Sequence, residues 1–85
     1  MSRQQAPQVA AVELVIADAL GVPPGAVLSP DDFDSFGVLV ALMAVEERFG
    51  IELPDGSLRS FADDVADLGT VGAVERLTER LGHPG

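Results

Sequence analysis

The stretch DDFDSFGVLVALMAVEERFG, residues 31–50, decides the fold, because it places the longest apolar run of the chain directly behind a cluster of aspartates. Asp34 is a residue type favoured at the N-cap of a helix, where its carboxylate can accept a backbone N–H. Gly50 is the type favoured where a helix ends in a left-handed residue. These two positions predict a helix that begins at Asp34 or Ser35 and ends at Phe49.

Apolar residues in this predicted helix fall on two faces. The first face, suited to the core of a bundle, carries at helical spacing Val38, Leu42, Val45 and Phe49. The second face, called here the outer stripe, carries Phe36, Leu39, Val40 and Met43. One interpretation is a central helix that its neighbours cover on all sides. The other, which we favour for the outer stripe as a whole, is a partner-binding surface, with Glu46 and Glu47 at its far end.

The first third of the chain predicts a helix and a long loop. A helical stripe is formed by Val9, Val12, Ile16 and Leu20. It predicts a first helix over about residues 7–20, with Pro7 in its first turn and Gly21 after its end. Residues 21–33 contain three prolines and two glycines, so we expect a loop there. The residues expected to hold this loop to the core are Val22, Val27 and Leu28.

The last third of the chain predicts a short helix followed by a longer one. A turn is expected at residues 54–56, Pro-Asp-Gly. Ser60 and Asp63 have the spacing of a capping box for a short helix over 61–68, closed by Gly69. Thr70 is expected to cap the last helix, whose apolar face carries Val71, Val74, Leu77 and Leu81.

These elements predict an all-α fold, a small bundle of three main helices plus one short helix. With 85 residues we expect a single domain over 1–85, with its core at about 9–81. The ends, residues 1–6 and 82–85, are expected to be flexible. We expect a monomer.

The composition narrows the function classes. Fourteen acidic residues against five arginines give a net charge of −9, so the surface should repel phosphate backbones, and we expect no nucleic-acid binding. No apolar run approaches the length of a membrane span, and the segment MSRQQAPQ lacks the apolar centre of a signal peptide. There is no cysteine, hence neither a disulfide nor a thiolate site. We therefore expect a soluble, cytoplasmic protein.

Ser35 does not fit the usual serine or metal chemistries. A serine nucleophile needs a base, usually a histidine, and the single histidine is His83, near the end of the sequence. A calcium loop beginning at Asp32 would place Phe36 and Met43 at positions that need oxygen donors, so we expect no metal site. On these grounds Ser35 could simply be a first-turn helix residue bonded to the local backbone.

The order of residues around Ser35 resembles the acyl carrier protein family, which includes peptidyl and aminoacyl carriers. That family has Asp-Ser followed by an apolar residue, an apolar-rich helix, paired glutamates, Phe-Gly and Ile-x-Ile/Leu-Pro. The matching residues here are Asp34, Ser35, Glu46, Glu47, Phe49, Gly50, Ile51, Leu53, Pro54 and Asp55. Leu20-Gly21-Val22 and Thr70-Val71-Gly72 also resemble family positions, so the resemblance covers about residues 9–81.

The resemblance implies that Ser35 is the attachment site of 4′-phosphopantetheine, which a phosphopantetheinyl transferase adds from coenzyme A. The thiol of that arm carries acyl or aminoacyl groups as thioesters, so the carrier itself would not be an enzyme. Asp34 would be both a motif residue and the helix cap. Acyl-transfer, adenylating or condensing enzymes would then be the partners. Their binding surface would consist of Phe36, Leu39, Val40, Met43, Glu46 and Glu47.

Several positions depart from the family pattern. Phe36 replaces the usual Leu or Met, and Gly37 and Val40 stand where fatty-acid carriers often have acids. Gly37 also gives the motif a likeness to D-alanyl carriers. The first loop is shorter than usual, and Phe33 is expected to fill the vacant apolar position. These departures favour a free-standing carrier in a specialised polyketide, nonribosomal-peptide or fatty-acid-like pathway; the alternative is an unmodified carrier fold that acts only as an interaction module.

Overall fold

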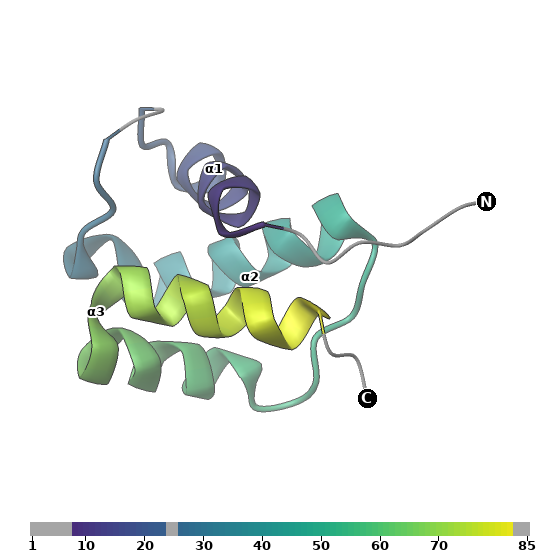
Figure 1. Cartoon of the computed structure of the whole chain (residues 1–85). Coiled ribbons are helices and arrows are strands. Elements are labelled where there is room, and N and C mark those ends of the chain that lie inside the picture. Colours follow the sequence, from purple (N-terminus) through teal and green to yellow (C-terminus); the bar gives the residue numbers. More distant parts are fainter. Residues whose placement is uncertain (1–7, 24–25, 83–85) are drawn as a thin grey trace.

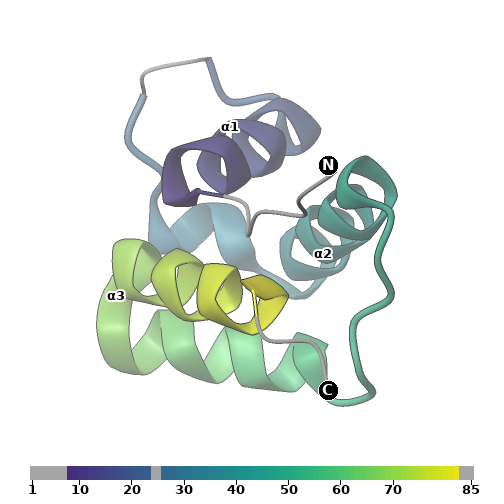
Figure 2. The same ribbon diagram turned by 45° about the vertical axis from the view of Figure 1, so that its right-hand side comes forward.

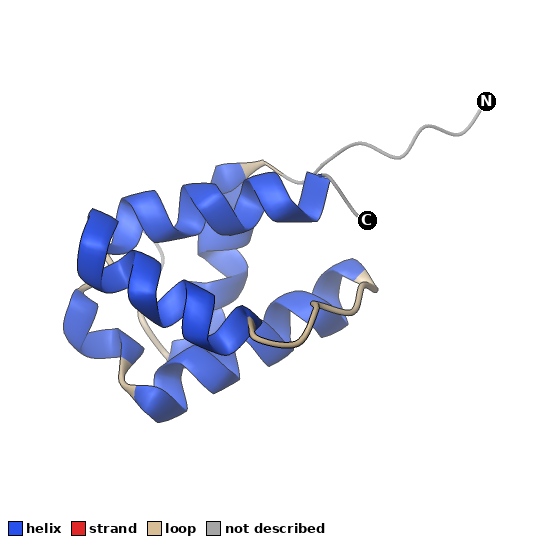
Figure 3. Cartoon of the chain, turned by 90° about the horizontal axis from the view of Figure 1, so that it is seen from below, coloured by secondary structure: helices blue, strands red, loops and turns tan. Residues whose placement is uncertain are grey.

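The structure, a computed structural model, describes residues 8–23 and 26–82. Its elements are α1 (Val9–Leu20), the 3₁₀-helix η1 (Pro30–Phe33), α2 (Ser35–Phe49) and α3 (Ser57–Gly82). Within those two ranges every regular element is a helix (Figures 1 and 3). The predicted all-α bundle is therefore confirmed. None of these helices is long and apolar enough to cross a membrane.

Helix α3 is divided into two arms at Gly69. The backbone of Gly69, with φ 81° and ψ 173°, is not helical, and an L-amino acid with a side chain rarely adopts that φ. The first arm covers residues 57–68 and the second arm residues 70–82, and they lie side by side in opposite directions (Figures 1 and 2). Nη2 of Arg80 in the second arm lies 3.6 Å from Oδ2 of Asp64 in the first arm. The predicted break at Gly69 is therefore confirmed.

Two helix starts differ from the predictions. Helix α1 begins at Val9, and its N-cap residue, Gln8, makes no side-chain hydrogen bond. Pro7 lies outside the described residues, and so do the two ends predicted to be flexible, apart from Gly82. The first arm of α3 begins at Ser57, not after a capping box at Ser60 and Asp63. The predicted 54–56 turn leads directly into the helix, because Ser57 donates from both its N–H and its hydroxyl to the carbonyl of Pro54.

The long first loop also contains a helix that the sequence analysis missed. A capping box forms at its start: Asp31 N–H donates to Ser29 Oγ at 3.2 Å, and Ser29 N–H donates to Asp32 Oδ2 at 2.8 Å. These bonds, with Pro30 in the first turn, stabilise η1. Leu28 is buried as predicted, but Val27 is 86% exposed, so the prediction that it holds the loop to the core is wrong.

The core lies between α2, α1 and the two arms of α3. α1 packs mainly on α2, and its buried residues Val12 and Ile16 are fully covered. The predicted core face of α2 is confirmed, since Val38, Leu42 and Val45 are buried; Phe49, at its end, is half-buried. Phe33 fills an apolar position as predicted. Its ring packs edge-to-face on that of Phe61, with the two ring centres 5.3 Å apart.

Thr70 joins the first loop to the second arm of α3. It begins that arm as predicted, but its hydroxyl donates to the carbonyl of Leu28 at 3.0 Å, in a buried bond across 42 residues. Thr70→Val should therefore leave that carbonyl unpaired and lower the free energy of unfolding by about 1–2 kcal/mol. Urea unfolding followed by circular dichroism measures the loss.

Thr78 provides a matched control for this prediction. It is as buried as Thr70, both being 8% exposed, but its hydroxyl donates to Val74, four residues earlier in the same helix. The Val74 carbonyl still has its helical N–H partner after Thr78→Val, so that variant should lose much less stability. Equal losses for the two variants would contradict a tethering role for Thr70.

Candidate functional site

Ser35 is the first residue of α2, and it is exposed. Asp34 is confirmed as the N-cap, because its side chain accepts the N–H of Gly37 at 2.7 Å, while its carbonyl accepts the N–H of Val38 at 2.9 Å. The N–H groups of Ser35 and Phe36 belong to the first turn and have no intrahelical acceptor. The hydroxyl therefore stands at the positive end of a helix dipole, on the outside of the molecule.

The segment before Ser35 is anchored at both ends. The capping box of η1 fixes its start, and the buried ring of Phe33 against Phe61 fixes its end. Only Asp34 separates η1 from α2. Ser35 is thus presented by two helices that meet at one residue, not by a free loop.

Gly37 is buried where the first turn of α2 meets η1. A Cβ atom at this position would overlap the backbone carbonyl oxygen of Asp32, and it would lie 3.2 Å from Oδ1 of Asp34. In the sequence, Gly37 stands out only as a departure from an acidic position and a likeness to D-alanyl carriers. The structure gives a packing reason for this glycine, which spacing along the chain could not reveal.

The outer stripe of α2 is largely uncovered. Phe36 is 73% exposed, Met43 57% and Leu39 40%, whereas Val40 is half-buried. A hollow of about 200 Å³ adjoins the stripe, between Leu39 and Met43 on one side and Leu58 on the other. The apolar surface beside Ser35 is therefore centred on Phe36, Leu39 and Met43, with Val40 turned partly inward.

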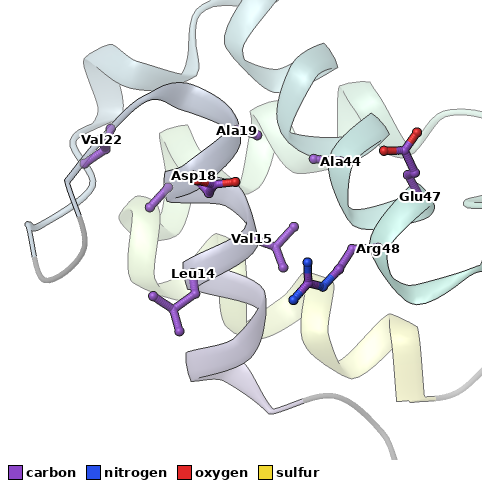
Figure 4. A pocket seen from close by; sticks show the side chains of 9 residues that line it. Leu14, Val15, Asp18, Ala19, Val22, Ala44, Glu47 and Arg48 are labelled. Carbon is purple, nitrogen blue, oxygen red and sulfur yellow. The ribbon is translucent and has the colours of Figure 1, made fainter.

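The two glutamates of α2 have different surroundings. Glu46 accepts the N–H of Leu53 at 2.7 Å, so its carboxylate holds the loop after α2. Glu47 lines a hollow between α1 and α2 together with Arg48, and Figure 4 shows the Arg48 side chain opposite Val15 of α1. The paired glutamates therefore do not form one charged edge of the outer stripe. Adjacent helix residues differ in direction by about 100°, which explains the separation.

Two opposing electrostatic effects act at Ser35, the negative charge of nearby aspartates and the positive end of the α2 dipole. Asp31 and Asp34 are exposed and Asp32 half-buried, and the carboxylates of Asp32 and Asp34 each accept a backbone N–H. The helix N-terminus favours an attached anion. Among residues 8–23 and 26–82 no cluster of three or more metal-ligating side chains is present. The chemistry available at the site is that of an accessible hydroxyl that another molecule can modify.

An all-helical bundle with an exposed serine at the start of α2 has the architecture of a small carrier protein. An acyl carrier protein of Zymomonas mobilis subsp. mobilis is 33% identical over 66 residues, which cover 71% of this chain and 76% of the relative. The chain belongs to the acyl carrier protein family. No family model matches it, and no solved structure matches it.

Proposed function

We propose that Ser35 is the attachment site of 4′-phosphopantetheine and that the protein carries acyl or aminoacyl groups as thioesters between enzymes. The observation that carries the proposal is the exposed Ser35 hydroxyl at the first position of α2, immediately after the N-cap Asp34. Membership of the acyl carrier protein family supports the same assignment. In this role the whole chain acts as one carrier domain, a monomer that depends on other enzymes for catalysis.

The residues at the start of α2 fit a phosphodiester. The carboxylate of Asp34 is engaged with Gly37 N–H, and the N–H groups of Ser35 and Phe36 remain for a phosphate oxygen or water. When attached, the group supplies a thiol, which this cysteine-free chain lacks. Attachment would form a bond from Ser35 Oγ to phosphorus and break the pyrophosphate bond of coenzyme A. Adenosine 3′,5′-bisphosphate would leave, and the hydroxyl proton would go to a base of the transferase.

Partner enzymes would bind the apolar surface beside Ser35. Phe36, Leu39 and Met43 offer exposed apolar side chains on the helix that begins at Ser35. Val40 and Glu47 are secondary candidates, and Glu46 would contribute with the part of its carboxylate not used by Leu53. Apolar residues flanked by charge are typical of transient protein interfaces. A phosphopantetheinyl transferase and acyl-transfer, adenylating or condensing enzymes are the proposed partners.

A specialised polyketide, nonribosomal-peptide or fatty-acid-like pathway is the proposed setting. Phe36, Gly37 and Val40 depart from the pattern of fatty-acid carriers, in which acids after the serine bind basic partners. A surface that binds by apolar contact suits partners other than the basic partners of fatty-acid carriers. The class of cargo, acyl or aminoacyl, follows from which loading enzyme accepts the protein.

Ser35→Ala should abolish modification. Incubation with coenzyme A and a broad-specificity phosphopantetheinyl transferase should raise the intact mass of the wild type by one phosphopantetheinyl group and leave Ser35→Ala unchanged. Ser57→Ala is the control, because Ser57 lies at the start of α3 and bonds to Pro54. That variant should be modified like the wild type. Equal modification of the wild type and Ser35→Ala would refute the attachment site.

The second candidate function is an unmodified interaction module, favoured by the amount of apolar surface on the outer stripe. Phe36 in particular is 73% exposed, and a stable partner could cover it. The same mass measurement on protein isolated from its native host separates the two functions. A carrier is found with the group attached, whereas an interaction module is found unmodified and in a stable complex.

A further inference from the structure

Helix α1 is apolar on nearly all sides, yet one side of it is uncovered. Of its 12 residues only Glu13 and Asp18 are charged. A helix that is apolar all round is normally buried all round. Here Val12 and Ile16 are fully buried against the rest of the bundle, but Leu14 is 57% exposed. The sequence alone gives no reason for a leucine in that position on a surface helix.

Leu14 stands between two hollows of the surface. One hollow, of about 520 Å³, lies between α1 and α2, and Figure 4 shows it bordered by Leu14, Val15 and Asp18 on one side and Arg48 on the other. The other, of about 400 Å³, lies between α1, the first loop and the start of the second arm of α3.

The second hollow is nearly all apolar. Its rim carries two further exposed side chains, with Val27 86% exposed and Val71 56% exposed. Its only charged lining residue within the described chain is Glu13, and its Thr70 hydroxyl is already bonded to Leu28. Three uncovered apolar residues, Leu14, Val27 and Val71, thus surround one apolar hollow, an arrangement typical of a binding surface. We call these three residues, with Glu13 and Asp18, the α1 surface.

The charges around the two hollows identify the kind of partner. Among the residues that the structure describes, the charged ones lining the two hollows are the acids Glu13, Asp18 and Glu47 and the base Arg48. A second copy of this chain would bring the same acids and a net charge of −9 to the interface, so self-association is opposed by repulsion. A partner with basic residues beside its apolar ones gains from the same field.

We infer that the α1 surface binds an amphipathic helix of another protein, whose apolar stripe covers Leu14, Val27 and Val71 and whose lysines or arginines face Glu13 and Asp18. The α1 surface shares no residue with the outer stripe of α2. The inference therefore stands apart from the proposed function of Ser35, and binding here leaves the residues of the outer stripe available to enzymes.

The test uses a peptide probe and two matched variants of the full chain. The probe is a leucine–lysine peptide of about 18 residues, with leucines at helical spacing. Leu14→Gln and Met43→Gln make the same polar change at two equally exposed positions, since each side chain is 57% exposed, one on the α1 surface and one on the outer stripe. Binding is measured by titration calorimetry and located by amide chemical shifts in the 15N-labelled protein.

We expect the leucine–lysine peptide to change the amide chemical shifts of α1 and of the residues near Val27 and Val71. Leu14→Gln should weaken binding about tenfold, and Met43→Gln by less than about twofold, because a central anchor residue dominates such contacts. A leucine–glutamate peptide of the same pattern should not bind. Circular dichroism should find both variants as helical as the wild type.

Several results would overturn the inference. Shifts centred on Phe36 and Met43 would place the partner site on the outer stripe instead. Equal affinity of the wild type and Leu14→Gln for the leucine–lysine peptide would show that Leu14 does not anchor the partner. Equal binding of the leucine–glutamate and leucine–lysine peptides would show that charge does not select the partner. Sedimentation that finds a dimer abolished by Leu14→Gln would identify a second copy as the occupant.

Discussion

Phe61→Ala should lower the free energy of unfolding by about 3–5 kcal/mol, the cost of removing a buried phenylalanine ring. The Phe61 side chain is 1% exposed, and its ring packs edge-to-face on Phe33. Small domains have about 5–15 kcal/mol of stability in total, so the loss is a large share of it. In a chain of this size the melting temperature should fall by more than about 12 °C. Thermal unfolding followed by circular dichroism measures the change.

Phe36→Ala is the matched control, because it makes the same chemical change at a surface position. Phe36 is 73% exposed, so its loss should change the free energy of unfolding by less than about 1 kcal/mol. The contrast also separates the two roles of phenylalanine in this chain, since Phe61 belongs to the core and Phe36 to the proposed partner surface. Similar losses for the two variants would mean that the core has been assigned wrongly.

Gly37→Ala should destabilise the protein, although helix propensity alone predicts the opposite. In an exposed helix interior, alanine is favoured over glycine by about 1 kcal/mol. Here the added methyl group would overlap the carbonyl oxygen of Asp32, which is a backbone atom and cannot rotate away. Either η1 or the first turn of α2 must shift, and overpacking of this kind costs about 1–3 kcal/mol, occasionally more. After the propensity gain is subtracted from this cost, we expect a net loss of up to about 2 kcal/mol.

Urea unfolding tests the Gly37 prediction, with Leu39→Ala as the control. Leu39 lies two residues further along α2 and is 40% exposed, so its truncation should cost less. Modification of Ser35 by the transferase should slow in Gly37→Ala, because Ser35 is the first residue of one of the two helices that must separate. An increase in stability for Gly37→Ala would show that η1 and α2 are less closely packed than described.

Most of the helices could be predicted because their signals are local. Caps and left-handed ends depend on residues within one turn, such as Asp34 with Gly37, or Gly50 and Gly69 at positive φ. The same kind of reasoning missed η1 and predicted the start of the next helix at Phe61, after a cap at Ser60, where the structure has Ser57. In both places another local motif formed instead: the capping box of Ser29 and Asp32, and the turn that leads into Ser57.

The candidate site could likewise be predicted from the sequence only in part. The position of Ser35 at a helix start followed from Asp34 and the apolar run behind it. The surroundings of Val40, Glu46 and Glu47 did not follow, because the outer stripe was defined by spacing along one helix. Whether a side chain on that helix is covered depends on α1 and on the loop after α2, which spacing does not describe.

The sequence by itself determined the helical class, the breaks at Gly50 and Gly69 and the place of Ser35 at the start of α2, since capping and helical periodicity act within a few residues. Only the tertiary structure decided which apolar side chains remain uncovered and why residue 37 is a glycine. Those features arise from contacts between distant segments, such as the bond from Thr70 to Leu28 across 42 residues. Such contacts form because apolar faces pack where the whole chain brings them together, and no local pattern specifies that choice.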